Sequence, residues 1–323
     1  MTILTQENPS RFVLFPIKEP RIWNMYEQQR ASFWWDSDIS FIAQDYKDWA
    51  SLSPDEIYFM ENILAFFAGA DGIVMENLAE RFLAEMKLPE VRAYFTLQLN
   101  IELVHSLVYA KLLDGYVRDP ERKKVLLRAN QDMPHVKAKT DWALQWISQG
   151  TLAERLIAFV CVEGIHFQGE FCAIFWMKER KKLPALTTAN YLIARDENMH
   201  KTNGCTLYRE YIESEDKLSQ DRVAAIVRGA VDAEIVFINE ALDCRLLGMN
   251  RDLMRQYIEF IADQICSELG YEPLYLSTNP FSFMERTAFD VKENFFETRV
   301  TAYKLPKNSD SYQLDTIQTD MEF

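Results

Sequence analysis

The residues best suited to chemistry lie in one apolar stretch, 99–109, which carries Glu102, His105 and Tyr109. On a helix each residue advances the chain by about 100°, so Glu102 and His105 lie side by side and Tyr109 follows one turn later on the same stripe. A carboxylate and an imidazole at positions i and i+3 of an inward helix face form half of a carboxylate-bridged two-metal site. The stretch therefore predicts metal chemistry inside a helical bundle.

The same Glu-x-x-His spacing occurs again at Glu197 and His200. A single match also fits an exposed glutamate near an ordinary helix histidine, because short motifs match by chance. The chain has only 4 histidines, however, and both matches fall in long helical segments. We therefore interpret the two pairs as two halves of one site.

Two metal ions need further carboxylates, and Asp71 and Glu163 are the candidates because both stand in apolar surroundings. A buried carboxylate needs a cation or hydrogen-bond donors, whereas a solvated helix position is the alternative for each residue. Four carboxylates and two imidazoles suit iron or manganese and leave coordination positions open for dioxygen. A structural zinc site would prefer thiolates or more histidines.

Tyr109 is the nearest oxidisable side chain to the predicted metals. Phe167, Phe171 and Ile193 are placed to form an apolar pocket around it, and a dry pocket protects a phenoxyl radical from quenching. The alternative is a core tyrosine whose hydroxyl is satisfied. Asp196, next to Glu197, can accept the second N–H of a metal-bound histidine, or it is a solvated aspartate paired with Arg195.

Long helices must position these residues. Ser53-Pro54-Asp55-Glu56 has a helix N-cap serine, a proline at the first helical position and a glutamate that completes a capping box. Only 10 glycines and 48% hydrophobic residues in 323 favour long helices over a turn-rich β fold. We expect an all-α bundle with helices over 23–30, 53–86, 89–117, 152–181, 184–212, 217–246 and 250–268, and two shorter helices within 120–149.

Charge and composition exclude several classes of protein. A net charge of −14 leaves no basic footprint for nucleic acid. The apolar run from Ile63 to Ala70 is far shorter than the ~20 residues that span a membrane, and no signal peptide begins the chain. The 5 cysteines are widely spaced, which predicts free thiols in the cytoplasm. We expect four carboxylates after residue 230 to be ordinary surface charges: Asp232, Glu234, Glu240 and Asp243.

Three regions follow from these patterns. Residues 1–20 hold three prolines and are expected to form an extended arm. Residues 21–303 form the helical domain with the metal site. Residues 304–323 are polar and acidic, end in Phe323, and are typical of a flexible tail that docks on a partner.

Nearly the whole chain, from Arg21 to Phe323, resembles the small, radical-generating subunit of class I ribonucleotide reductase, and is most similar to eukaryotic-type members. The resemblance rests on many short segments together. These are Ala31-Ser32-Phe33-Trp34, Leu64-Ala65-Phe66-Phe67, Asp71-Gly72-Ile73-Val74, the Glu102/His105/Tyr109 helix, Val162-Glu163-Gly164-Ile165, Arg195-Asp196-Glu197 with His200, Gly248-Met249-Asn250, Gln256-Tyr257-Ile258-Glu259-Phe260 and Asn279-Pro280-Phe281.

The resemblance implies a ferritin-like fold, a homodimer and a role for each site residue. Six residues match the dimetal ligands: Asp71, Glu102, His105, Glu163, Glu197 and His200. Tyr109 matches the radical tyrosine, and Trp34 and Asp196 match the hydrogen-bonded chain that, with His105, links the metals to the partner. Tyr303 matches the tail tyrosine that relays onward, with Tyr312 as the second choice.

The resemblance also implies a partner, a large catalytic subunit that reduces ribonucleotides and receives the tail. Family members with these ligands use two irons, two manganese ions or one of each, and some store the oxidant on the metals rather than on the tyrosine. His166 departs from close relatives and stands near the site. The alternatives are a stand-alone ferritin-like dimetal oxidase or oxygenase and a metal-storage protein.

Overall fold

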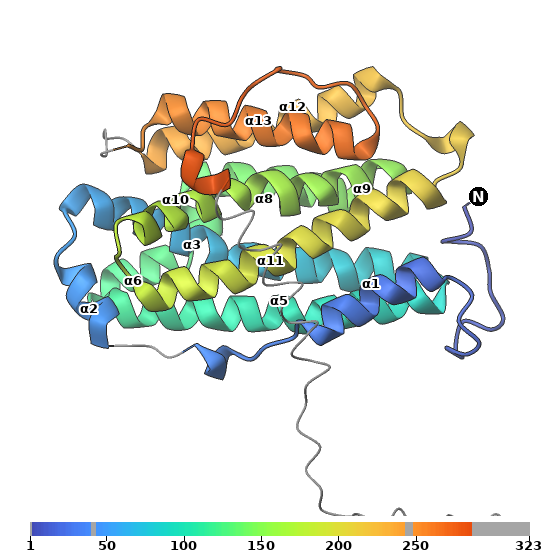
Figure 1. Ribbon diagram of the computed structural model, residues 1–323, viewed down its shortest axis with the longest axis horizontal. Coiled ribbons are helices and arrows are strands. Elements are labelled where there is room, and N and C mark those ends of the chain that lie inside the picture. The colour runs from blue at the N-terminus through green and yellow to red at the C-terminus, as the bar shows by residue number, and fades with distance from the viewer. Residues whose placement is uncertain (1, 40–42, 243–247, 286–323) are drawn as a thin grey trace, which may run out of the picture.

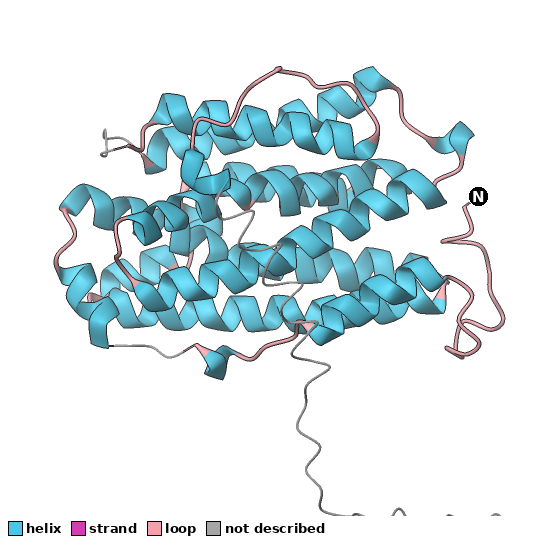
Figure 2. Cartoon of the chain, viewed as in Figure 1, coloured by secondary structure: helices cyan, strands magenta, loops and turns pink. Residues whose placement is uncertain are grey.

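The computed structural model describes residues 2–39, 43–242 and 248–285, and every regular element within these ranges is a helix (Figures 1 and 2). The all-α prediction is therefore confirmed. Within these ranges, eight helices are twelve residues or longer and build the body of the bundle together with α9. They are α1 (Pro20–Ala31), α3 (Pro54–Asn77), α5 (Pro89–Tyr116), α8 (Pro134–Ser148), α10 (Gln168–Glu179), α11 (Pro184–Thr206), α12 (Gln220–Ala241) and α13 (Arg251–Leu269), with α9 at Leu152–Cys161.

The long helices run roughly along the long axis of the molecule in stacked layers (Figure 1). Helix α3 packs against α5, α8 against α12, and α9 against α11, while α1 covers the outer side of α5 and α13 covers α12. Short elements connect them: α2 (Ala43–Ala50), α4 (Leu83–Glu85), α6 (Pro120–Leu126) and α7 (Ala129–Asp132). The centre of the bundle thus lies between α3, α5, α9–α10 and α11.

Local sequence signals explain where the helices begin. The Ser53 side chain accepts a hydrogen bond from the Glu56 amide at 3.2 Å, and Glu56 Oε2 accepts one from the Ser53 amide at 2.7 Å, which completes the predicted capping box of α3. Thr151 and Glu154 form a second capping box at α9. Helices α5 and α11 also start with proline, which lacks the N–H that the first turn of a helix leaves unpaired.

The predicted helix over 152–181 is not continuous, and this is the main correction to the element boundaries. It divides into α9, a π-helical turn η3 (Val162–His166) and α10. Similar π-helical turns end α3 at Leu78–Phe82 and α11 at Leu207–Tyr211. A π turn inserts one residue and therefore re-aims the side chains that follow it. Helix α2 was not predicted.

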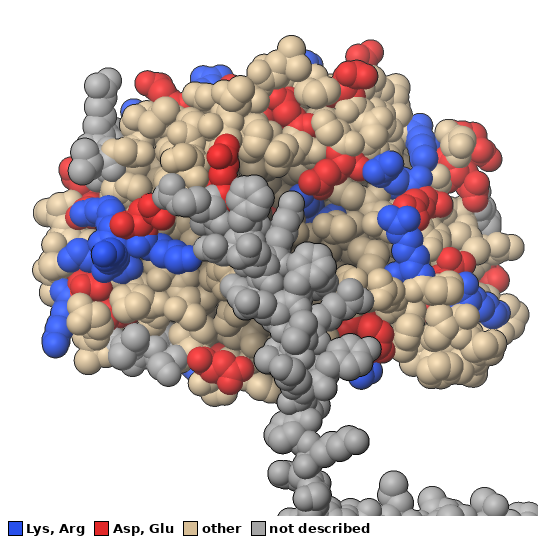
Figure 3. All heavy atoms as spheres, viewed as in Figure 1, with Lys and Arg blue, Asp and Glu red and all other residues tan. Residues whose placement is uncertain are grey.

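Two helical stretches, Pro54–Glu85 and Leu152–Glu179, are long and apolar enough to cross a membrane by length and composition alone, but 61% and 89% of those windows are buried inside the bundle. Most of each window therefore packs in the core of the bundle. On the face shown in Figure 3, basic and acidic side chains are interspersed over the described surface. Cys161, Cys172, Cys205 and Cys266 are buried free thiols, and Cys244 lies outside the described residues.

The first residues of the described chain are anchored to the body. The Leu4 side chain is fully buried, and the hydroxyl of Thr2 donates a hydrogen bond to the carbonyl of Tyr211. Further along, Phe12 and Phe15 are exposed before α1 begins.

Candidate metal centre

The structure brings the six predicted metal ligands together from four parts of the bundle. Each is at most 1% exposed. Asp71 comes from α3, Glu102 and His105 from α5, Glu163 from the π turn η3, and Glu197 and His200 from α11. Helical periodicity explains the pairs, because positions i and i+3 share a face.

The ligand atoms of Glu102, Glu163, Glu197 and His200 all lie within 4.8 Å of one another. His200 Nδ1 is 2.7 Å from Glu197 Oε2 and 3.1 Å from Glu102 Oε1. His105 Nδ1 is 2.8 Å from Glu197 Oε1 and 3.6 Å from Glu102 Oε2. Glu197 therefore lies between the two imidazoles, where its two oxygens would be available to a pair of metal ions.

Unpaired buried atoms show that these residues fit a pair of metal ions. Although His105 Nδ1 and Glu197 Oε1 lie 2.8 Å apart as an ion pair, each of the six side chains has a buried nitrogen or oxygen without a hydrogen bond: Asp71 Oδ2, Glu102 Oε2, His105 Nδ1, Glu163 Oε2, Glu197 Oε1 and His200 Nε2. Buried polar atoms are normally hydrogen-bonded, so a cluster in which every side chain has such an atom needs an explanation. Four carboxylates balance the formal charge of two divalent cations, which removes the cost of burying them uncompensated.

The protonation of the cluster follows from burial and from its internal charges. Burial, together with the neighbouring carboxylates, raises the pKa of Asp71 and of Glu163 well above the ordinary value. Burial opposes the charge on His200, but Glu197 and Glu102 outweigh it and raise the His200 pKa to about 9. Glu197 has a lowered pKa although burial acts against it, because both imidazoles face it. Without metal ions, protons thus neutralise part of the cluster.

Gln98 is a site residue that the sequence analysis missed. Its side chain is fully buried one turn before Glu102, and Nε2 donates to Glu102 Oε1 at 2.9 Å and to Glu163 Oε1 at 3.2 Å. The i, i+4 spacing from Glu102 was the available signal, because it places an amide on the same inward stripe. Gln98 holds two of the carboxylates in orientation.

Trp34, Asp196 and His105 form the predicted hydrogen-bonded chain. Trp34 Nε1 donates to Asp196 Oδ2 at 2.7 Å, and the same oxygen is 3.2 Å from His105 Nε2. Arg195 donates to the other Asp196 oxygen at 2.8 Å and to the Ser32 carbonyl at 2.7 Å. Asp196 is 1% exposed, so the solvated alternative is wrong although its pairing with Arg195 is present.

Tyr109 is fully buried, and its hydroxyl has no hydrogen-bond partner among the described residues. Its ring stacks on Phe67 with centroids 4.2 Å apart and planes within 2°. Phe67 in turn contacts Phe167 and Phe171, so the predicted aromatic pocket reaches Tyr109 through a residue that was not predicted. Ile193 is buried in the same core cluster. Burial, with the charge of Asp71, raises the Tyr109 pKa well above its ordinary value.

Other predicted residues lie apart from this cluster. His166 is buried with Nε2 3.1 Å from the Ala230 carbonyl and its ring against Trp142, on the α8–α12 side. Asp232 and Glu240 are exposed as predicted, but Glu234 is fully buried, so that prediction is wrong. Glu234 pairs with Lys139 of α8, and the sequence around Glu234 gives no indication of a partner on another helix. Tyr303, Tyr312 and Asp243 fall outside the described residues.

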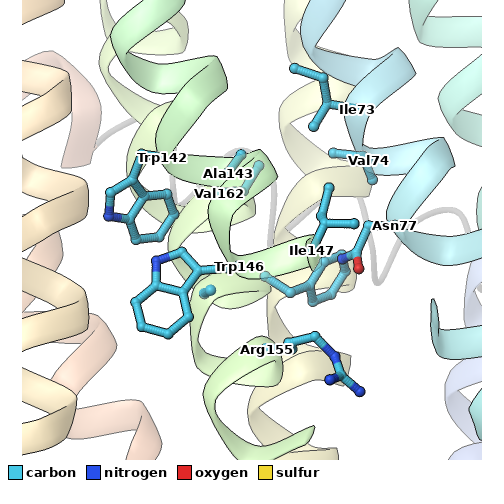
Figure 4. Close-up of a pocket in the computed structure, with 11 residues that line it drawn as sticks. Ile73, Val74, Asn77, Trp142, Ala143, Trp146, Ile147, Arg155 and Val162 are labelled. Carbon is cyan, nitrogen blue, oxygen red and sulfur yellow. The ribbon is translucent and has the colours of Figure 1, made fainter. Parts of the chain in front are cut away.

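A small cavity lies between α3, α8 and α9, next to Val162 and therefore close to Glu163 in the chain (Figure 4). Trp142 and Trp146 stand on one side of it and Ile73 and Val74 on the other. Its free volume of about 20 Å³ holds roughly one water molecule. It is not a pocket for an organic substrate.

The comparisons with known proteins agree with this geometry. Residues 11–280 match the family model described as "Ribonucleotide reductase, small chain". The chain is 48% identical over 302 residues to the ribonucleoside-diphosphate reductase small chain of Trypanosoma brucei brucei, covering 93% of this chain and 89% of that protein. It is 45% identical over 303 residues to human ribonucleoside-diphosphate reductase subunit M2, covering 93% and 77%.

Solved structures show the same fold. The Rnr4 homodimer of Saccharomyces cerevisiae superimposes with a TM-score of 0.78 at 32% identity, covering 94% of this chain and 93% of that one. The dimanganese(II)-NrdF of Streptococcus sanguinis has a TM-score of 0.76 at 18% identity, with coverages of 84% and 96%, and supports the fold alone. With the ferritin-like bundle confirmed, the chain belongs to the small-chain family of ribonucleotide reductase and is of the class I, eukaryotic-like type.

Proposed function

We propose that this chain generates and stores the one-electron oxidant that starts ribonucleotide reduction in a separate large catalytic subunit. The proposal depends on one observation: the buried ligand set is connected to a chain of hydrogen-bonded side chains. A buried set of six metal ligands is linked through His105 and Asp196 to Trp34, whose indole is 7% exposed. A subunit that oxidises a separate protein needs such a route for electrons and protons from its buried centre toward the surface.

Two metal ions fit the centre, with Asp71, Glu102, His105, Glu163, Glu197 and His200 as their ligands. Iron is our first choice, and two manganese ions or one ion of each suit the same donors. When bound, such ions reduce dioxygen or a related oxygen species and become strong oxidants. Gln98 orients Glu102 and Glu163 for this task through the hydrogen bonds described above.

Tyr109 is the proposed store of the oxidising equivalent. Its stacked aromatic surroundings exclude water, which would otherwise quench a radical. The raised pKa keeps the phenol protonated, so oxidation of Tyr109 must release a proton to a nearby acceptor. Among the candidate ligand carboxylates, Asp71 has the largest effect on the Tyr109 pKa, so we propose it as the acceptor of this proton.

Asp196 and Trp34 are proposed to carry an electron and a proton between the metals and the partner. Asp196 accepts hydrogen bonds from both Trp34 and Arg195 and faces His105, so a proton shift at either end changes the charge felt at the other. Tyr303 is proposed as the next relay, on the route through residues 304–323 to the large subunit. We further propose a homodimer in the cytoplasm, with residues 1–20 as an arm before the helical domain 21–303.

The competing function is a stand-alone ferritin-like oxidase or oxygenase. Such an enzyme needs room for a substrate beside its metals, whereas each of the six candidate ligands is at most 1% exposed. Such an enzyme also does not require a buried series of hydrogen bonds from His105 to Trp34.

The deciding experiment is electron paramagnetic resonance on protein purified from its native source, with metal content measured on the same sample. We expect a narrow organic signal near the free-electron value, together with bound iron, that disappears in Tyr109→Phe. A broad manganese-structured signal that survives Tyr109→Phe would move the stored oxidant to the metals. Protein that turns over an organic substrate at full rate without any large subunit would overturn the proposal.

A further inference from the structure

A second fully buried ionic cluster lies behind the π turn that carries Glu163. It consists of Lys139 from α8, Glu170 from α10 and Glu234 from α12, whose side chains are all 0% exposed. None of them belongs to the metal ligands. Burying one ammonium and two carboxylates costs several kcal/mol per ion, and an apolar trio would stabilise the bundle as well or better. Stability alone therefore does not explain why these three ionisable side chains are buried together.

The Lys139 ammonium lies against three oxygens, two of which accept hydrogen bonds from it and one of which forms an ion pair with it. Nζ donates to the His166 carbonyl at 2.8 Å and to Glu170 Oε1, and it lies 2.7 Å from Glu234 Oε2. It also lies 3.4 Å from the centre of the Phe66 ring, a cation–π contact. These contacts hold the ammonium in one position, and the ammonium in turn holds the oxygens around it.

The His166 carbonyl is the contact that connects this cluster to the metal centre. His166 is the last residue of η3, the turn that begins at Val162 and aims Glu163 at the other ligands. The His166 ring is held as well, with Nε2 3.1 Å from the Ala230 carbonyl of α12. Lys139 and α12 thus hold both the main chain and the side chain at the end of the turn.

Two glycines show how closely the neighbouring helices press on this segment. A Cβ atom at Gly164 would come within 2.6 Å of Ile265 Cδ1, and one at Gly169 within 2.5 Å of Glu234 Oε1. A larger residue at either position would displace the end of the Ile265 side chain from α13 or the Glu234 carboxylate from α12. The turn is therefore wedged between α12 and α13 and has little freedom to drift.

Burial and neighbouring charges act together on the titratable groups of the cluster. Burial raises the pKa of both Glu170 and Glu234, while the Lys139 ammonium acts in the opposite direction on each. The other titratable group that faces the cluster is His166, whose pKa burial and Lys139 lower well below its ordinary value. His166 is therefore neutral beside the Lys139 ammonium.

We propose that Lys139, held by Glu170 and Glu234, is a positioning residue that fixes the π turn through the His166 carbonyl and thereby keeps the Glu163 carboxylate directed at the dimetal site. This inference rests on the proposed function, because it assumes that Glu163 binds a metal ion. Lys139 touches neither metal nor substrate and acts only through the backbone of the turn.

The test compares Lys139→Met with wild type and with Arg122→Met, using full-length protein. Arg122→Met is the matched control, because it breaks a partly buried ion pair with Glu61 between α6 and α3, away from the turn. Two quantities are measured: Mn²⁺ affinity and stoichiometry, and backbone amide hydrogen exchange of residues 162–170 in metal-free protein. We expect Lys139→Met to weaken Mn²⁺ binding about 10- to 100-fold, as loss of an outer partner of a ligand does, and to speed exchange in 162–170.

A charge-compensated variant separates positioning from stability. Lys139→Met/Glu234→Gln removes one buried charge of each sign, so it should regain thermal stability while Mn²⁺ affinity and exchange in 162–170 stay impaired. If affinity returns together with stability, the cluster has only a structural role and the proposal is wrong. Wild-type affinity and exchange in Lys139→Met would overturn it equally.

Two further arrangements keep the test decisive. If Lys139→Met does not fold, Glu234→Gln retains the lysine but weakens its hold, and the same readouts apply with smaller shifts. If wild type itself binds no pair of Mn²⁺ ions, the proposed function fails, whereas the exchange of residues 162–170 in metal-free protein still reports whether Lys139 holds the turn.

Discussion

Asp196 shares one carboxylate oxygen between Trp34 and His105, and this contact gives the sharpest prediction at the level of single residues. Trp34→Phe keeps an aromatic ring but removes the indole N–H. We expect metal content to stay at the wild-type level while reductase activity with the large subunit falls about 10- to 100-fold, the usual effect of losing an outer partner of a metal ligand.

Trp35→Phe is the matched control, because Trp35 is adjacent in the chain but 58% exposed. It should retain full activity. Equal losses in both variants would show that Trp34 serves packing rather than transfer, and lost metal content in Trp34→Phe would point to a disturbed centre.

The protonation of the ligands predicts how metal binding depends on pH. In metal-free protein the pKa values of Asp71, Glu163, His105 and His200 are raised, so these groups hold protons that metal ions must displace. Affinity should therefore increase as pH rises. The increase in Tm on adding Mn²⁺ should grow as pH rises toward about 9, the pKa of His200, measured by scanning calorimetry.

Asp71→Asn supplies the comparison for this pH dependence, because an amide has no proton to release. Its Mn²⁺-induced change in Tm should vary less steeply with pH. A wild-type shift that is flat or declines with pH would contradict the assignment of these groups as ligands.

Asp71 and Glu163 were predicted from their apolar neighbours in the sequence, whereas the other four of the six candidate ligands follow from a local rule: Glu102, His105, Glu197 and His200. Two residues three apart on a helix share a face whatever the rest of the chain does. Gln98 and Phe67 were not predicted as site residues, because each is important through a contact with a residue of another element. Glu234 was misjudged for the same reason, because its partner Lys139 comes from α8.

At the scale of elements, the α3 capping box allows a quantitative test. Ser53→Ala removes the side-chain acceptor for the Glu56 amide and should lower the free energy of unfolding of the metal-free protein by about 1 kcal/mol. Denaturant unfolding followed by circular dichroism measures this. Ser53→Thr should change it little, because threonine also caps, and a full effect there would locate the cost elsewhere.

The first residues of α3 and α5 could be predicted from the sequence, but the π turns could not. Serine, threonine and proline mark a helix start by direct contact with neighbouring amides, so the starts of α3 and α5 were predictable. A π turn is stabilised by packing around it, as at Val162–His166 between α12 and α13, and it uses the same residue types as an ordinary helix. Composition and periodicity therefore carry no sign of it.

At the scale of the whole molecule, binding of the partner and building of the centre should be separable. Removing residues 314–323 takes away the proposed docking tail but none of the six ligands. We expect this truncated chain to bind metals and form its signal as wild type does, yet to lose activity with the large subunit. Binding to an immobilised large subunit should fall in parallel, and full deoxynucleotide production by the truncated chain would refute the tail assignment.

The six candidate ligands are almost completely buried, which has a consequence for any metal ions that they bind. Such an ion would leave only when the surrounding helices separate, and openings of a packed core cost a large share of the global stability. Exchange would then be far slower than binding to a newly folded chain. The ions in a mature molecule would therefore reflect which metals were abundant when it folded, and two molecules of identical sequence made under different metal supplies would be chemically different proteins.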